Sequence, residues 1–136
     1  MRDEQPQKLE PLVLLVEDEL GLSKLMVMIL EDEGYRVVEA ANGAQGLVKL
    51  ALEKPALIIT DYMMPELNGY EMVCAIRKNP AYDDVRILMM SAALPQQLPI
   101  GGLVDHFLQK GTGLETLVAT IRRLVEGGDT PTEPPR

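Results

Sequence analysis

Residues 12–18 read LVLLVED, five apolar residues followed directly by two acids. A short apolar run without polar interruptions is typical of a strand that is buried on both faces, as in a parallel sheet. Pro11 precedes the run, and the acids Glu17 and Asp18 end it. The stretch therefore predicts a buried strand whose carboxyl end carries two acidic side chains.

Similar runs recur along the chain and alternate with stretches of helical spacing. Strands are expected at 12–16, 35–40, 56–60, 85–90 and 104–109, with apolar stripes of helical period at 20–30, 44–51, 70–77 and 114–125. Strands that alternate with helices predict right-handed crossovers and a parallel sheet with helices on both faces. The predicted fold class is α/β, with a five-stranded, doubly wound parallel sheet.

Two segments in the C-terminal half carry more specific expectations. Residues 94–102 read LPQQLPIGG, and two prolines with two glycines oppose a regular helix. The fourth helix of the alternating pattern is therefore expected to be short or irregular. Thr112, with Glu115 three residues later, predicts a capping box for the last helix.

Composition and charge argue against several classes of function. Of 136 residues, 46% are hydrophobic and 25% are charged, which fits one globular domain. Thirteen Lys and Arg against 21 Asp and Glu leave a net charge of −8, which argues against direct binding to nucleic acid or to an anionic membrane. Cys74 and His106 are the single cysteine and histidine, too few for an internal disulfide or a zinc site.

The ends of the chain differ from its middle. The first residues lack the apolar core of a signal peptide, and no apolar stretch approaches the ~18 residues of a membrane span, so a cytoplasmic protein is expected. Residues 1–10 are expected to be flexible. Residues 127–136, rich in Gly and Pro, are expected to be a tail or linker. This leaves 11–126 as the domain.

The residues that end the predicted strands are chemically unusual. They are Glu17 and Asp18, Asp61, Ser91 and Lys110. Taken singly, they are ordinary helix caps, turn residues or solvated charges. In an open parallel sheet, however, the carboxyl ends of the strands meet at one edge, where sites form. Three carboxylates, a hydroxyl and an ammonium are therefore expected to converge there.

That set of groups indicates a chemistry. Three carboxylates close together repel one another and favour a hard divalent cation such as Mg²⁺. An aspartate that attacks a phosphoryl group needs the charge on the transferring oxygens neutralised, which Mg²⁺, Lys110 and Ser91 could do together. Transfer to one of these carboxylates would give an acyl phosphate.

Four segments resemble one known family, the response-regulator receiver domain of bacterial two-component signalling. They are LLVEDE from Leu14, ITDYMMPELNGYE from Ile59, LMMSAA from Leu88 and FLQKG from Phe107. The resemblance spans about residues 11–126. Its most specific part is the DxxMPxxxG pattern that begins at Asp61.

The resemblance implies roles for individual residues. It makes Asp61 the phosphoacceptor, and it assigns Mg²⁺ to Glu17, Asp18, Asp61 and the backbone carbonyl of Met63. It makes Ser91 and Lys110 the phosphoryl ligands, with Ser91 and Phe107 as the switch pair. Positions that influence the lifetime of the phosphate correspond to Met63 and Ala93. Neither of these side chains orients a water, so slow self-hydrolysis is expected.

Two departures from the family pattern stand out. Gly111 follows Lys110 where the family usually has proline, often after a cis bond, so a trans bond and a shifted loop are expected. The stretch from Ser91 to Lys110 is a few residues shorter than usual. The shortening falls where the fourth helix belongs.

The leading interpretation is a phosphoacceptor rather than an enzyme. A histidine kinase or phosphotransfer protein would donate to Asp61, and the domain would switch its affinity for a downstream protein. The alternative is a receiver-like binding module that works without phosphate, supported by the shortened fourth-helix region. A metal-dependent phosphatase is disfavoured, because such enzymes need a second acid where Met63 stands. The oligomeric state does not follow from the sequence.

Overall fold

The computed structural model describes residues 10–62, 68–92 and 102–126. Its elements are β1 (Leu12–Val16), α1 (Leu20–Asp32), β2 (Arg36–Ala40), α2 (Gly43–Leu52), β3 (Leu57–Asp61), α3 (Gly69–Arg77), the 3₁₀ turn η1 (Pro80–Tyr82), β4 (Arg86–Ser91), β5 (His106–Gln109) and α4 (Leu114–Val125). Within these ranges no helix has the length and apolar character needed to cross a membrane.

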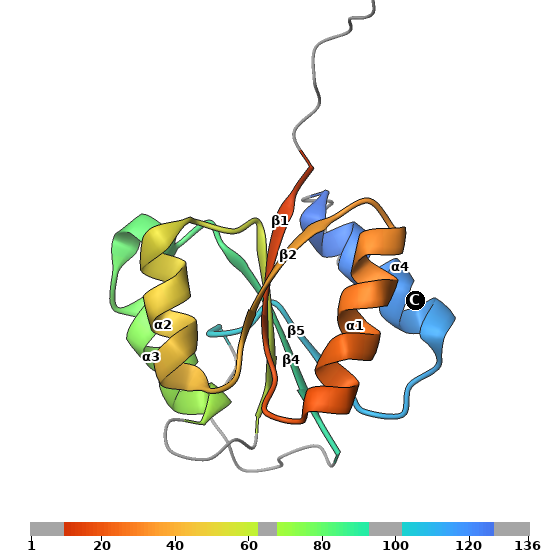
Figure 1. Cartoon of the computed structure of the whole chain (residues 1–136). Helices are drawn as coiled ribbons and strands as arrows, with labels where there is room; N and C mark the ends of the chain where they lie inside the picture. The colour runs from red at the N-terminus through yellow and green to blue at the C-terminus, as the bar shows by residue number, and fades with distance from the viewer. Residues whose placement is uncertain (1–9, 63–67, 93–101, 127–136) are drawn as a thin grey trace, which may run out of the picture.

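The five strands form one parallel sheet in the order β2-β1-β3-β4-β5. Helices α2 and α3 cover one face and α1 and α4 cover the other, so the sheet is the middle of three layers (Figure 1). The predicted doubly wound α/β fold is confirmed. The strand order reverses between β1 and β3, and sites in such sheets form outside the carboxyl ends at that point.

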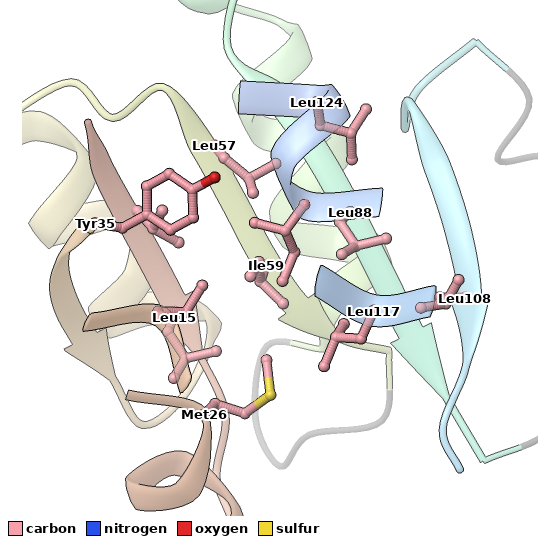
Figure 2. Packing of buried hydrophobic residues seen from close by; sticks show 12 residues of the cluster. Leu15, Met26, Tyr35, Leu57, Ile59, Leu88, Leu108, Leu117 and Leu124 are labelled. Atoms are coloured by element: carbon pink, nitrogen blue, oxygen red, sulfur yellow. The ribbon is translucent and has the colours of Figure 1, made fainter. Parts of the chain in front are cut away.

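The strands are buried on both faces because successive side chains enter different cores. Leu15 of β1 packs on the α1 and α4 side, whereas its neighbours Leu14 and Val16 pack on the α2 and α3 side. Figure 2 shows the first cluster, in which side chains from the sheet meet Met26 of α1 and Leu117 of α4. Because both faces of β1 are buried, its sequence is a continuous apolar run without alternating polar residues.

Asparagine caps begin two of the helices. Asn42 accepts a hydrogen bond from the Gln45 amide at 2.9 Å before α2. Asn68 and Glu71 form a reciprocal capping box before α3, with Asn68 Oδ1 2.8 Å from the Glu71 amide. Each cap satisfies donors that the first helical turn leaves open. The second cap thus fixes where α3, the helix that follows Asp61 in the chain, begins.

The capping box predicted for the last helix is wrong. The N-cap of α4 is Gly113, which makes no side-chain cap, and the Thr112 hydroxyl instead donates to the Gln109 carbonyl at 2.6 Å. Gly111 adopts φ +93°, in the left-handed region, and a turn closes before the helix begins. Thr112 therefore belongs to that turn and lies outside the helix.

The connection between β4 and β5 is described only at its ends. Of the segment expected to be irregular, 94–102, residues up to 101 lie outside the described ranges, and Gly102 sits in a turn with φ +86°. After it, Asp105 Oδ2 accepts the Ile87 amide at 2.8 Å and lies 3.3 Å from the Arg77 guanidinium. Arg77 also donates to the Leu103 carbonyl at 2.9 Å. These bonds tie the chain leading into β5 to β4 and α3.

Candidate functional site

The structure brings three of the predicted carboxylates together. Strands β1 and β3 are neighbours, with Val16 opposite Thr60, so the residues that follow them in the chain lie side by side. Glu17, Asp18 and Asp61 each place a carboxylate oxygen within 4.8 Å of the others. Glu17 and Asp61 are each 7% exposed, whereas Asp18 is exposed to solvent. The cluster is thus an acidic pocket that is open on the Asp18 side.

Lys110 brings a positive charge to this cluster. Its ammonium nitrogen lies 3.2 Å from Asp61 Oδ2 and 3.6 Å from Glu17 Oε1. The Lys110 amide donates to the Ser91 carbonyl at 2.7 Å, which continues the pairing of β4 with β5. Ser91 is the last residue of β4 and is buried. Four strand ends therefore supply the predicted side chains to one edge of the sheet.

Backbone contacts hold the acids in place. Glu17 Oε2 accepts the Glu19 amide at 3.1 Å, at the beginning of α1. The Thr60 hydroxyl donates to the Asp61 carbonyl at 3.0 Å. The Gly69 amide donates to the Tyr62 carbonyl at 2.9 Å, which brings α3 against the end of β3. These bonds hold the carboxylate of Glu17 and the backbone from which the side chain of Asp61 projects.

Burial raises the pKa of Asp61 above its usual value, although the hydrogen bond and charge of Lys110 oppose this rise, and Asp18 adds to it. Burial likewise raises the pKa of Glu17, against the Glu19 amide and Lys110. Burial alone would lower the pKa of Lys110, but Asp61 and Glu17 outweigh burial and raise it. One ammonium therefore does not fully compensate the desolvation and mutual repulsion of the acids.

The donor set fits Mg²⁺. This ion takes oxygen ligands and keeps several waters, and it is usually bound by a few carboxylates together with phosphate oxygens. Glu17, Asp18 and Asp61 offer carboxylate oxygens in one pocket, and Asp18 opens the pocket to water. The raised pKa values of Glu17 and Asp61 indicate negative charge that a second cation would stabilise.

An apolar cavity adjoins the acidic pocket. Its volume is about 240 Å³, and it lies between the sheet and the helices α1 and α4. Leu22, Met26 and Leu117 are among its apolar lining residues, while Asp61 and Lys110 border its polar end. Lys110 therefore borders open space as well as the acidic pocket.

The remaining predicted site residues are Phe107, Met63 and Ala93. Phe107 is half-buried in β5 and packs with the α2 and α3 core, whereas its neighbour Leu108 enters the core on the other face. Met63 and Ala93 lie outside the described residues.

Two residues beside Lys110 were not predicted to belong to the site, one of them having been assigned to a helix cap. These are Gln109, whose carbonyl accepts the Thr112 hydroxyl, and Thr112 itself. The glycines that flank Thr112 were the available signal, since glycine pairs mark turns.

The comparison with known families agrees with this geometry. The profile of the response regulator receiver domain matches residues 13–122. The chain belongs to the response regulator receiver domain family. Among curated relatives, the probable transcriptional regulator ycf27 of Cyanophora paradoxa is 34% identical over 123 residues, which cover 88% of this chain and 50% of that protein. This receiver chain thus spans about half the length of that relative.

Solved structures carry the same fold. The chemotaxis response regulator CheY4 of Vibrio cholerae superimposes with a TM-score of 0.79 at 29% identity, covering 85% of this receiver chain and 99% of that one. The response regulator TrrA of Thermotoga maritima, in complex with Mg²⁺-BeF, gives a TM-score of 0.77 at 27% identity over 84% of this chain and 98% of that one. The acidic group of Glu17, Asp18 and Asp61 is compatible with the Mg²⁺ site of the family.

Proposed function

We propose that Asp61 takes a phosphoryl group from a histidine kinase or a histidine phosphotransfer protein, and that this changes the affinity of the domain for a downstream protein. The observation that carries the proposal is the ion pair of Lys110 with the buried Asp61, inside a cluster of three carboxylates. The Mg²⁺-BeF complex of the TrrA relative supports a metal-dependent site.

We also propose that the domain extends over residues 11–126 and acts in the cytoplasm.

The proposed transfer is a displacement at phosphorus. A carboxylate oxygen of Asp61 attacks, the P–N bond of the donor phosphohistidine breaks, and the leaving imidazole takes up a proton from water. The new O–P bond makes an acyl phosphate. Lys110, already 3.2 Å from Asp61 Oδ2, would turn its ammonium to the phosphoryl oxygens, and the Ser91 hydroxyl would donate to another. The transfer thus requires positioning and charge neutralisation more than covalent chemistry.

In this proposal Glu17, Asp18, Asp61 and the backbone carbonyl of Met63 hold Mg²⁺. When bound, the ion neutralises the negative charge that Asp61 and the transferring oxygens bring together. The chain's own contribution is to keep Glu17 and Asp61 buried and attached to β1 and β3. These two carboxylates are thus in place before the donor arrives.

The switch is proposed to use Ser91 and Phe107. They lie on the adjacent strands β4 and β5, where Ser91 pairs with Gln109 and Met89 pairs with Phe107. A hydroxyl drawn toward the phosphoryl group would shift the end of β4 relative to β5. Phe107, only half-buried, could then change its exposure without unpacking the main core.

The test is the intact mass of the protein after incubation with acetyl phosphate, with and without Mg²⁺. Wild-type protein should gain one phosphoryl group only when Mg²⁺ is present. Asp61→Asn should gain none, whereas Asp32→Asn, an exposed aspartate at the end of α1, should behave like wild type. A wild-type protein that never gains the mass would contradict the proposal and favour a binding module that works without phosphate.

A further inference from the structure

The turn after β5 is closed on a single carbonyl. The carbonyl oxygen of Gln109 accepts the Thr112 amide at 3.2 Å and the Thr112 hydroxyl at 2.6 Å. Gly111 supplies the left-handed conformation that such a turn needs, with φ +93°. Lys110 is the second residue of this turn, and its own amide is bonded to the Ser91 carbonyl at 2.7 Å. The backbone of Lys110 is thus bonded to β4 on one side and enclosed by the turn on the other.

The same turn also reaches the chain beyond Ser91. Gln109 lies opposite Ser91 in the sheet, and its side-chain Nε2 donates to the Ala92 carbonyl at 3.1 Å. The two phosphoryl ligands proposed above, Ser91 and Lys110, are therefore linked by hydrogen bonds that involve Gln109 and Thr112. This linkage does not pass through the acidic cluster.

Packing does little to hold the turn. Lys110, Gly111 and Thr112 all line the cavity of about 240 Å³, and Leu114, the first residue of α4, is 56% exposed. The N-cap Gly113 makes no side-chain cap that would attach the helix to the turn. Atoms that face a cavity lack close contacts on that side. The position of the Lys110 backbone therefore depends on its bond to Ser91 on one side and on the two hydrogen bonds to the Gln109 carbonyl on the other.

We propose that Thr112 is a positioning residue for phosphoryl transfer, because its hydroxyl holds the Gln109–Thr112 turn and so places the ammonium of Lys110 beside Asp61. Lysine carries its charge on a flexible four-carbon stem, so the position of its backbone limits where the charge can lie. Small misplacements of a group that stabilises the transition state reduce the rate strongly. The inference rests on the proposed phosphoacceptor role of Asp61.

The first experiment measures the maximal rate of Asp61 phosphorylation by acetyl phosphate at saturating Mg²⁺. Thr112→Val keeps the shape of the side chain but lacks the hydroxyl, and it should slow the reaction roughly tenfold. Thr112→Ser keeps the hydroxyl and should react at the wild-type rate. Thr112→Ala should lose as much as Thr112→Val, which separates the hydroxyl from side-chain volume. Thr116→Val, the same change at an exposed position on α4, is the control and should have no effect.

Two further readouts separate positioning from general damage. The Mg²⁺ concentration that gives half the maximal rate should be unchanged in Thr112→Val, because the metal ligands are not altered. In a Lys110→Ala background, Thr112→Val should cause no additional loss, because Thr112 acts through Lys110. Wild-type rates in Thr112→Val, equal losses in Thr112→Ser, or losses that multiply in the double mutant would each overturn the inference. Wild-type protein that takes no phosphoryl group would overturn the proposed function itself.

Discussion

Gly69 lies so close to Asp61 that it has no room for a side chain. A Cβ atom added at Gly69 would collide with the Asp61 carbonyl oxygen and press on the backbone of Tyr62. All of these neighbours are backbone atoms, which cannot swing away as a flexible side chain would. The first residue of α3 therefore packs directly against the end of β3, and this contact places the proposed phosphoacceptor.

Gly69→Ala is accordingly expected to destabilise the fold by about 1–3 kcal/mol, the usual range for overpacking a rigid site, and to slow phosphorylation of Asp61. Gly21→Ala is the matched control, because a Cβ at Gly21, in the first turn of α1, meets nothing within 4 Å. It should stabilise the fold by up to about 1 kcal/mol, since alanine favours a helix. Urea unfolding of both variants tests the pair. Equal stability changes would show that the contact is unimportant.

The acidic cluster predicts that Mg²⁺ raises the melting temperature of the wild-type domain. A ligand that binds only the folded state stabilises it in proportion to the logarithm of its concentration. The double change Glu17→Gln with Asp18→Asn should remove this gain. Glu31→Gln with Asp32→Asn makes the same change of charge at the exposed end of α1 and should keep it. A gain that survives in the first pair would place the metal elsewhere.

The burial of Asp61 also predicts how the stability of the metal-free domain depends on pH. Burial raises the pKa of Asp61, so ionising it costs more in the folded state than in the unfolded chain. Asp61→Asn should therefore be more stable than wild type at neutral pH. The difference should shrink as the pH falls through the raised pKa of Asp61 and should be nearly lost at about pH 3, below the ordinary aspartate pKa of about 3.9, where the carboxyl group is protonated in both states. Urea midpoints at the two pH values, measured in EDTA, test this. A less stable Asp61→Asn at neutral pH would mean that the ion pair with Lys110 outweighs the burial cost.

By resemblance, Met63 and Ala93 occupy the positions that influence the lifetime of the phosphate in the family. Neither side chain can orient a water toward phosphorus, so the acyl phosphate should hydrolyse slowly. Introducing polar groups with Met63→Asn or Ala93→Glu should accelerate the loss, for which the ~10²–10⁴-fold of general acid–base catalysis is an upper guide. The decay of the phosphorylated mass over time is the measurement. Unchanged decay in both variants would show that water access is limited elsewhere.

Much of the fold followed from local patterns. The apolar run at Leu12–Val16 predicted a strand buried on both faces, and the alternation of strands and helices then required a parallel sheet. In such a sheet Asp61 and Lys110 had to reach the same edge although they are distant in the chain. The trans bond expected between Lys110 and Gly111 is also confirmed, since no cis bond occurs among the described residues.

The environment of Thr112 could not be predicted in the same way. A Thr with Glu three residues later is compatible with a capping box, but the hydroxyl can equally bond a preceding carbonyl. Which bond forms depends on the left-handed Gly111 and on where β5 ends, and β5 ends where its pairing with β4 ends. Both conditions are set by the tertiary structure and not by the local sequence. The cavity beside Lys110 could not be predicted for the same reason, because it depends on how α1 and α4 meet over the sheet.

The central claim is that the carboxylate of Asp61 itself carries the phosphoryl group. Borohydride reduces an acyl phosphate to an alcohol and releases phosphate, so a phosphorylated aspartate becomes homoserine. Wild-type protein treated with acetyl phosphate and Mg²⁺, reduced and digested, should yield a peptide with homoserine at position 61 and aspartate at 18. Homoserine at another position, or none in protein that has gained the phosphoryl mass, would contradict the account.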